Sequence, residues 1–161
     1  MTNTLRTTKI NLIDFIEQTN EQLFQDIYKN CPVQTGEEED KKLSPLFISR
    51  LLFIVYGNWA ARYEEPLFAN ARFVICSTGA FEEDWRDYSI TGKLAKLAKF
   101  NLTLMPAEIV FLKLLVKKTL RFSTWSLCRF IQTTDLWSEE QIGQPIEGAT
   151  IRQWFKANQL D

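Results

Sequence analysis

The sequence contains no histidine, and this absence removes several kinds of chemistry at once. Histidine is the commonest general base, activates serine and cysteine nucleophiles, and is the usual nitrogen ligand of zinc. We therefore expect a protein that is not an enzyme and that holds no metal and no cofactor. A carboxylate-based enzyme is a distant alternative, and Glu83 and Asp87, which share a helix face in FEEDWRDY, would be its acid/base pair.

Cysteine, glycine and long apolar runs are also scarce. Cys31, Cys76 and Cys128 are widely spaced and form no C-x-x-C pair, so neither a disulfide framework nor a zinc knuckle is indicated. The six glycines form no phosphate-binding pattern. The apolar run at 51–56 is far shorter than the ~20 residues that span a bilayer. These features predict a cytoplasmic protein with reduced thiols.

Apolar residues are abundant, at 45% of the chain, and they recur at spacings of three and four. No alternating strand pattern or hairpin dipeptide is recognised. The prediction is an all-α, single-domain bundle of about seven helices over residues 1–161, with an exposed acidic loop at 31–43 and a C-terminal helix pair at 137–161. The predicted helical segments are 8–30, 44–63, 66–79, 81–88, 105–122, 123–132, 138–144 and 148–160.

Capping signals define several of these helices. Ser44 followed by Pro45 starts a segment that is apolar nearly all round, which predicts a central helix. Ser138, with Gln141 three residues later, has the form of a capping box. Thr150 is the expected cap of the last helix.

The net charge of −1 conceals a polarised chain. Residues 1–90 hold 9 Lys and Arg against 14 Asp and Glu, and residues 131–161 hold 2 against 5. Residues 92–130 hold 8 against one, Glu108. Like-signed blocks of this kind indicate a surface for a partner of the opposite charge.

Two parts of this basic segment carry most of its cations. In KLAKLAKF three lysines recur every third residue and Phe100 falls among them, as on surfaces that stack a base and bind phosphates. Further along, Lys113, Lys117 and Arg121 are spaced to form a row roughly 12 Å long on one helix side. The predicted nucleic-acid-binding residues are Lys93, Lys96, Lys99, Phe100, Lys113, Lys117, Lys118, Arg121 and Arg129.

These cations favour contact with a nucleic-acid backbone, DNA or RNA, by a helical accessory subunit of a larger nucleoprotein assembly. Its expected partners are nucleic acid and other protein subunits, with no membrane and no small-molecule substrate. A solvated helix face without function, an acidic protein partner of an adaptor or inhibitor, and an anionic membrane surface also fit lysine-rich helices.

The C-terminal helix pair offers a lesser alternative, because helix, turn and helix broadly resemble a helix-turn-helix protein that binds DNA. Arg152, Gln153 and Lys156 would then be the residues that read bases. The spacing is about two residues shorter than is usual for that motif.

Overall fold

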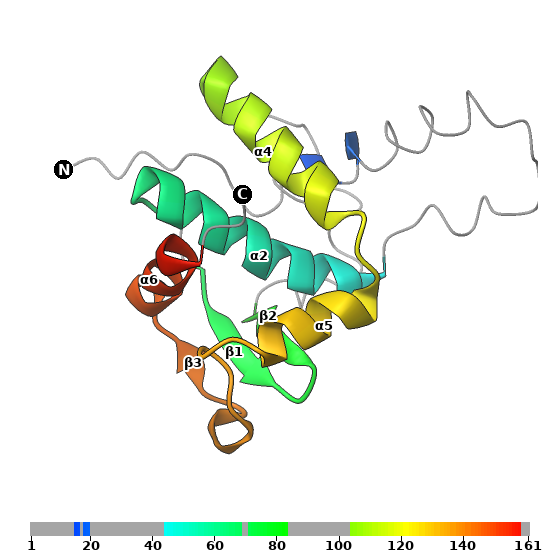
Figure 1. Ribbon diagram of the computed structural model, residues 1–161, viewed down its shortest axis with the longest axis vertical. Helices are drawn as coiled ribbons and strands as arrows, with labels where there is room; N and C mark the ends of the chain where they lie inside the picture. The colour runs from blue at the N-terminus through cyan, green and yellow to red at the C-terminus, as the bar shows by residue number, and fades with distance from the viewer. Residues whose placement is uncertain (1–14, 17, 20–43, 69–70, 84–103, 159–161) are drawn as a thin grey trace, which may run out of the picture.

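The computed structural model describes residues 15–16, 18–19, 44–68, 71–83 and 104–158, arranged as in Figure 1. The described residues form a mixed α/β structure in which helices surround α2 and a small sheet lies beside it (Figure 1). The elements are α2 (Pro45–Tyr63), β1 (Phe73–Cys76), β2 (Gly79–Glu82), α4 (Pro106–Thr119), α5 (Thr124–Gln132), the one-turn 3-10 helix η3 (Glu139–Gln141), β3 (Pro145–Ile146) and α6 (Gly148–Ala157).

The helix α2 is central, as its apolar sequence predicts. Ser44 is its N-cap in an extended conformation, and the Ser44 hydroxyl accepts a hydrogen bond from the Phe47 amide at 3.1 Å. The helix ends where Glu64 adopts a left-handed conformation, with φ of 54°. Helices α4, α5 and α6 and strand β2 all contact it, so its side chains are buried on nearly every side.

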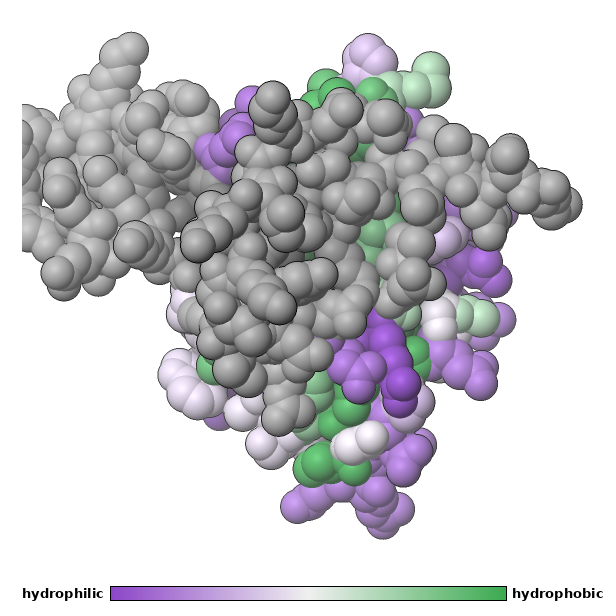
Figure 2. Space-filling view, turned by 180° about the vertical axis from the view of Figure 1, so that it is seen from behind, coloured by the Kyte–Doolittle hydropathy of each residue, from purple (hydrophilic) through white to green (hydrophobic). Residues whose placement is uncertain are grey.

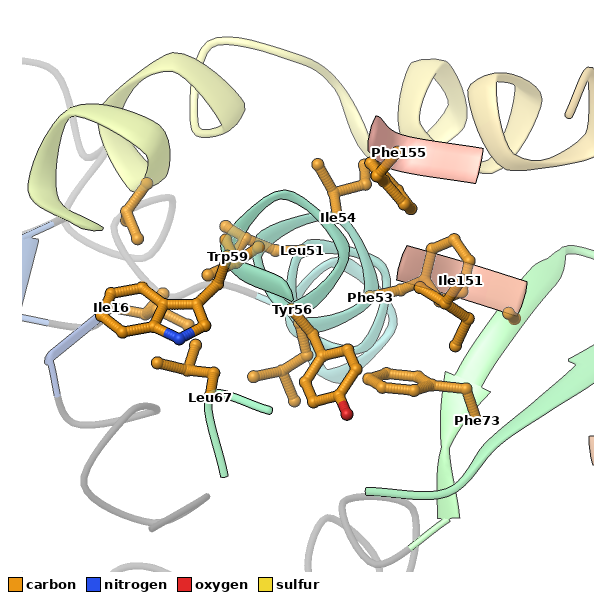
Figure 3. Close-up of a cluster of buried hydrophobic side chains, with 14 of the residues drawn as sticks. Ile16, Leu51, Phe53, Ile54, Tyr56, Trp59, Leu67, Phe73, Ile151 and Phe155 are labelled. Carbon is orange, nitrogen blue, oxygen red and sulfur yellow. The ribbon is translucent and has the colours of Figure 1, made fainter. Parts of the chain in front are cut away.

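Figure 3 shows how separate segments complete the core around α2. Ile16 and Leu67 lie beside Trp59, whereas Phe73 and Ile151 lie on the side of Phe53. The described residues of the predicted helix 8–30 are helical, and the Thr19 hydroxyl donates to the Phe15 carbonyl at 2.7 Å.

The all-α prediction is wrong, because residues 73–82 form a β-hairpin. Strand β1 pairs antiparallel with β2, and β3 pairs antiparallel with the other edge of β1, which gives the order β2-β1-β3. The predicted helix 66–79 is thus replaced by strand and turn, and Phe81 lies in β2 rather than on a helical aromatic stripe. Residues 84–88 of that predicted stripe lie outside the described residues.

Burial explains why the strand was mistaken for a helix. Phe73, Val74 and Ile75 are consecutive in β1 and all three are buried, so the alternation of a half-exposed strand is missing. A short, continuous apolar run cannot be assigned to strand or helix from periodicity alone. The turn that reverses the chain is Ser77-Thr78, and Gly79 follows it with φ of 120°, a conformation that favours glycine.

The other predicted helices had mixed outcomes. The segment 123–132 is confirmed as α5, the segment 105–122 contains the shorter α4, which ends at Thr119, and 148–160 corresponds to α6. The segment 138–144 contains only the single turn η3; Ser138 precedes it without a side-chain capping bond. Thr150 lies inside α6, which has Glu147 as its N-cap, so that expected cap is also wrong. Residues 31–43 lie outside the described residues.

Candidate nucleic-acid interface

Five of the nine predicted nucleic-acid-binding residues lie on α4, α5 and the turn between them. Lys113, Lys117 and Lys118 are on α4, Arg121 is in the turn, and Arg129 is on α5. We refer to these five as the basic surface. The other four predicted residues are Lys93, Lys96, Lys99 and Phe100, and they lie outside the described residues.

The buried side of α4 determines where its lysines lie. Pro106 occupies the first turn, and the Glu108 carboxylate accepts a hydrogen bond from the Met105 amide at 2.9 Å. Leu112 and Val116 are fully buried on the same side, where α4 contacts α2. Lys113 and Lys118 are exposed and Lys117 is half-buried. Helical spacing places all three on the side away from the core.

The predicted row Lys113, Lys117 and Arg121 is helical only for its first two members. Helix α4 ends at Thr119, and the Arg121 amide donates to the Lys118 carbonyl at 3.4 Å. The Phe122 amide donates to the Thr119 carbonyl at 3.1 Å. These bonds span three residues instead of four, so Arg121 lies in a tight turn directly after the helix.

Helix α5 starts at once after this turn. The Ser123 hydroxyl accepts a hydrogen bond from the Ser126 amide at 3.1 Å and caps the helix. Leu127, Cys128 and Ile131 are buried. Arg129 lies on the opposite, exposed side, four residues after Trp125.

Two aromatic side chains on this surface were not predicted from the sequence. Trp125 is 67% exposed and Phe122 is 54% exposed. The signal for Trp125 was present, because the apolar set 127, 128 and 131 leaves residues 125 and 129 on the other side of the helix. Phe122 was assigned to the end of a helix, and its exposure follows from the turn that ends α4.

The charged side chains around the basic surface are almost all positive. Between Glu108 and Asp135 the sequence has no acidic residue, and Glu108 is buried at 5% exposure. None of the five cations of the basic surface forms an ion pair with a described residue. The first turn of α5 has no acidic side chain either, so the positive end of the helix dipole adds to their field. The result is a local positive potential on a protein of net charge −1.

One further cation, Arg62, contacts α4 from α2. Its guanidinium lies 4.9 Å from the ring centroid of Phe111 and 5.9 Å from that of Tyr63. A cation over aromatic faces is held in place by the ring quadrupole. Sequence spacing could not associate Arg62 with α4, because the two segments are far apart in the chain.

The predicted base-reading residues are on α6, which contacts α5 through the rings of Trp154 and Phe130, whose centroids are 5.9 Å apart. Figure 1 shows α6 and α4 on different sides of α2. Gln153 is exposed, but Lys156 pairs with Glu64 at 2.5 Å, next to the end of α2. A hydrogen bond and the charge of Lys156 lower the pKa of the Glu64 carboxyl.

Arg152 is half-buried on the same helix. Its charge partly opposes the effect of burial, which raises the pKa of the Tyr56 hydroxyl. The helix that should precede α6 in a helix-turn-helix is the single turn η3, followed by β3. The three residues therefore lie on a helix that packs on α2 rather than on the second helix of such a motif.

The described residues contain only one of the two carboxylates considered for catalysis, Glu83 and Asp87. Glu83 binds Arg72 through an ion pair of 3.2 Å, and Asp87 lies outside the described residues. Within the described part of the chain, no group of three or more Cys, Asp or Glu side chains is arranged to hold a metal ion.

No protein-family model, no curated protein and no solved structure matches this chain. Its function has to be argued from its own surface. Among the helices that the structure describes, none is both long enough and apolar enough to cross a membrane.

Proposed function

We propose that this protein is a non-enzymatic accessory subunit that contacts a nucleic-acid backbone through the basic surface. One observation carries the proposal: five cations lie along α4, the turn and α5, and none of them pairs with an acidic side chain of the described residues. Solvated helix faces usually mix charges of both signs. Phosphates supply the missing negative charge, and each neutralised phosphate releases a counterion.

The location proposed for this subunit is the cytoplasm. Cys76 and Cys128 are free thiols, which suits a reducing compartment.

The test compares two triple variants that change the net charge equally. Lys113→Gln, Lys117→Gln and Arg121→Gln together remove three positive charges from the basic surface. The control adds three negative charges elsewhere, at the exposed Gln141, Gln144 and Ala149, each replaced by Glu. Since both triples lower the net charge by three, a difference between them cannot come from net charge.

Fluorescence anisotropy with labelled DNA and RNA at low salt is the assay, and circular dichroism checks that both variants fold. We expect the basic-surface triple to weaken binding by at least about tenfold, because three phosphate contacts are lost, and the control to bind nearly as the original chain does. Equal affinities of the two triples would refute the basic surface as the binding site.

A second candidate, binding of an acidic protein partner, is favoured by apolar exposure on α4. Val110 is 59% exposed and Leu114 is 57% exposed, and lysines flank them on the same helix. Figure 2 shows hydrophobic beside hydrophilic surface at the upper end of the molecule, the level at which α4 begins in Figure 1. An exposed apolar strip with a charged rim is common at protein interfaces.

The two candidates respond differently to Val110→Ser with Leu114→Ser. A protein partner that survives nuclease treatment and is lost on this double substitution would support the second candidate. Nucleic-acid affinity that stays unchanged in the same variant supports the first, because backbone binding depends on the cations.

A further inference from the structure

Two large aromatic side chains near the turn between α4 and α5 are largely exposed to solvent. Phe122 and Trp125 are the two aromatic side chains of the described residues that are more than half exposed, whereas Trp59 and Phe53 are fully buried. Neither ring stacks on another ring of the described chain. Full burial of a side chain of this size stabilises a fold, and neither position makes that gain.

Each ring has a cation of the basic surface close to it in the chain. Trp125 and Arg129 are one helical turn apart on the exposed side of α5, a spacing that brings Cβ atoms within about 5–6 Å of each other. Arg121 directly precedes Phe122 in the turn. Exposed rings with a cation on either side along a short path are the combination that binds bases by stacking and phosphates by charge.

The exposed side of α5 has little that would read a duplex. Its residues are Trp125, Ser126 and Arg129, so Arg129 is its one side chain that can donate a bidentate pair of hydrogen bonds to base edges. In a duplex the bases are stacked inside the helix and offer their faces to no side chain. In a single strand the faces are open.

We infer that the nucleic acid bound here is single-stranded, with bases stacked on Trp125 and Phe122 and phosphates held by the basic surface. This inference rests on the proposed function and specifies its ligand. Stacking is tolerant of sequence because every base has a flat face, so no strong sequence preference is expected.

The experiment titrates the full chain with labelled oligothymidylate and oligouridylate of about 16 nucleotides, the upper end of site sizes for small single-strand binding folds, and with a blunt duplex of equal length. Trp125→Ala should weaken single-strand binding by about 5- to 150-fold and leave its salt dependence unchanged, since no charge is lost. Trp125→Phe should restore most of the affinity. Phe122→Ala should have a smaller effect in the same direction.

Ile142→Ala is the matched control, because Ile142 is an exposed apolar residue at the C-cap of η3 and belongs to neither α4, α5 nor the turn between them. It should bind as the original chain does. Single-strand affinity that is unaffected by Trp125→Ala, or duplex affinity equal to or above that of the single strand, would overturn this inference while the proposed function stands. Failure of every probe to bind at low salt would overturn both.

Discussion

Gly57 lies where α6 packs on α2, and Gly57→Ala tests how tight this packing is. A Cβ at this position would lie 2.2 Å from Cδ2 and Cε2 of Phe155. The Phe155 ring has little room to move, because it is 1% exposed and its centroid lies 5.7 Å from that of Phe53 and 5.0 Å from that of Trp154.

The size of the effect follows from two opposing contributions. Extra volume in a packed core costs about 1–3 kcal/mol, whereas replacing Gly by Ala inside a helix stabilises it by about 1 kcal/mol. Because the clash involves ring atoms at 2.2 Å, we expect the upper part of the range and a net loss of about 1–2 kcal/mol. For a chain of this length that corresponds to about 2–8 °C in Tm.

Measuring Gly57→Ala in a protein that also lacks the Phe155 ring separates the steric clash from the helix preference for alanine. In a Phe155→Ala protein the Cγ, Cδ2 and Cε2 atoms are absent, so the clash is relieved while the helix preference for alanine remains, and Gly57→Ala should be neutral or stabilising by up to about 1 kcal/mol. Urea unfolding of the four proteins measures the coupling between the two sites. An equal loss in both backgrounds, or a stabilising Gly57→Ala in the original chain, would contradict the packing described here.

Three further predictions concern single positions. Gly79→Ala should destabilise by about 1–3 kcal/mol in urea unfolding, because φ is 120° and a Cβ would lie 3.3 Å from Cβ of Ile131; no change would contradict the turn geometry. Trp59→Phe should cost no more than about 1 kcal/mol, far less than the 3–5 kcal/mol of a Trp→Ala change, because the buried Nε1 has no hydrogen-bond partner among the residues that the structure describes; a loss like that of Trp→Ala would refute this. The ion pair with Lys156 lowers the pKa of Glu64, so the stability that this pair adds is complete above the ordinary carboxyl pKa and is lost as pH falls through the lowered pKa. The difference in Tm between the original chain and Glu64→Gln should therefore shrink over that acid range. A difference in Tm that does not depend on pH would contradict this prediction.

The helices that sequence analysis placed correctly have strong local signals. Ser44 with Pro45 starts α2, Pro106 starts α4, and Ser123 caps α5, each through bonds between residues close in the chain. Such signals depend little on the rest of the fold, which is why they can be identified in a single sequence.

The elements that were missed depend on contacts between distant segments. Strand β3 pairs with β1 about 70 residues earlier, and the Trp137 indole donates to the Cys76 carbonyl at 2.7 Å. At Ser138, where a capping box was expected, the chain forms a single 3-10 turn without a side-chain capping bond. Pairing across such a distance leaves no periodic pattern in either segment.

The candidate site was predicted in part. Counting charges along the chain identified the basic surface, because a like-signed block is visible in sequence. The exposure of Phe122 and Trp125 was not predicted, since it depends on where α4 ends and which side of α5 packs on the core. Aromatic residues are usually buried, so their type alone indicated core rather than surface.

The most direct test of the account is the salt dependence of nucleic-acid binding by the unmodified chain. If each of the five cations of the basic surface neutralises one phosphate, raising the salt from ~50 to ~200 mM should lower the affinity by about 100- to 500-fold. The variant without Lys113, Lys117 and Arg121 charges should lose only about tenfold over the same range. Binding that is nearly independent of salt, or absent at ~50 mM, would contradict the central claim that this surface holds a nucleic-acid backbone.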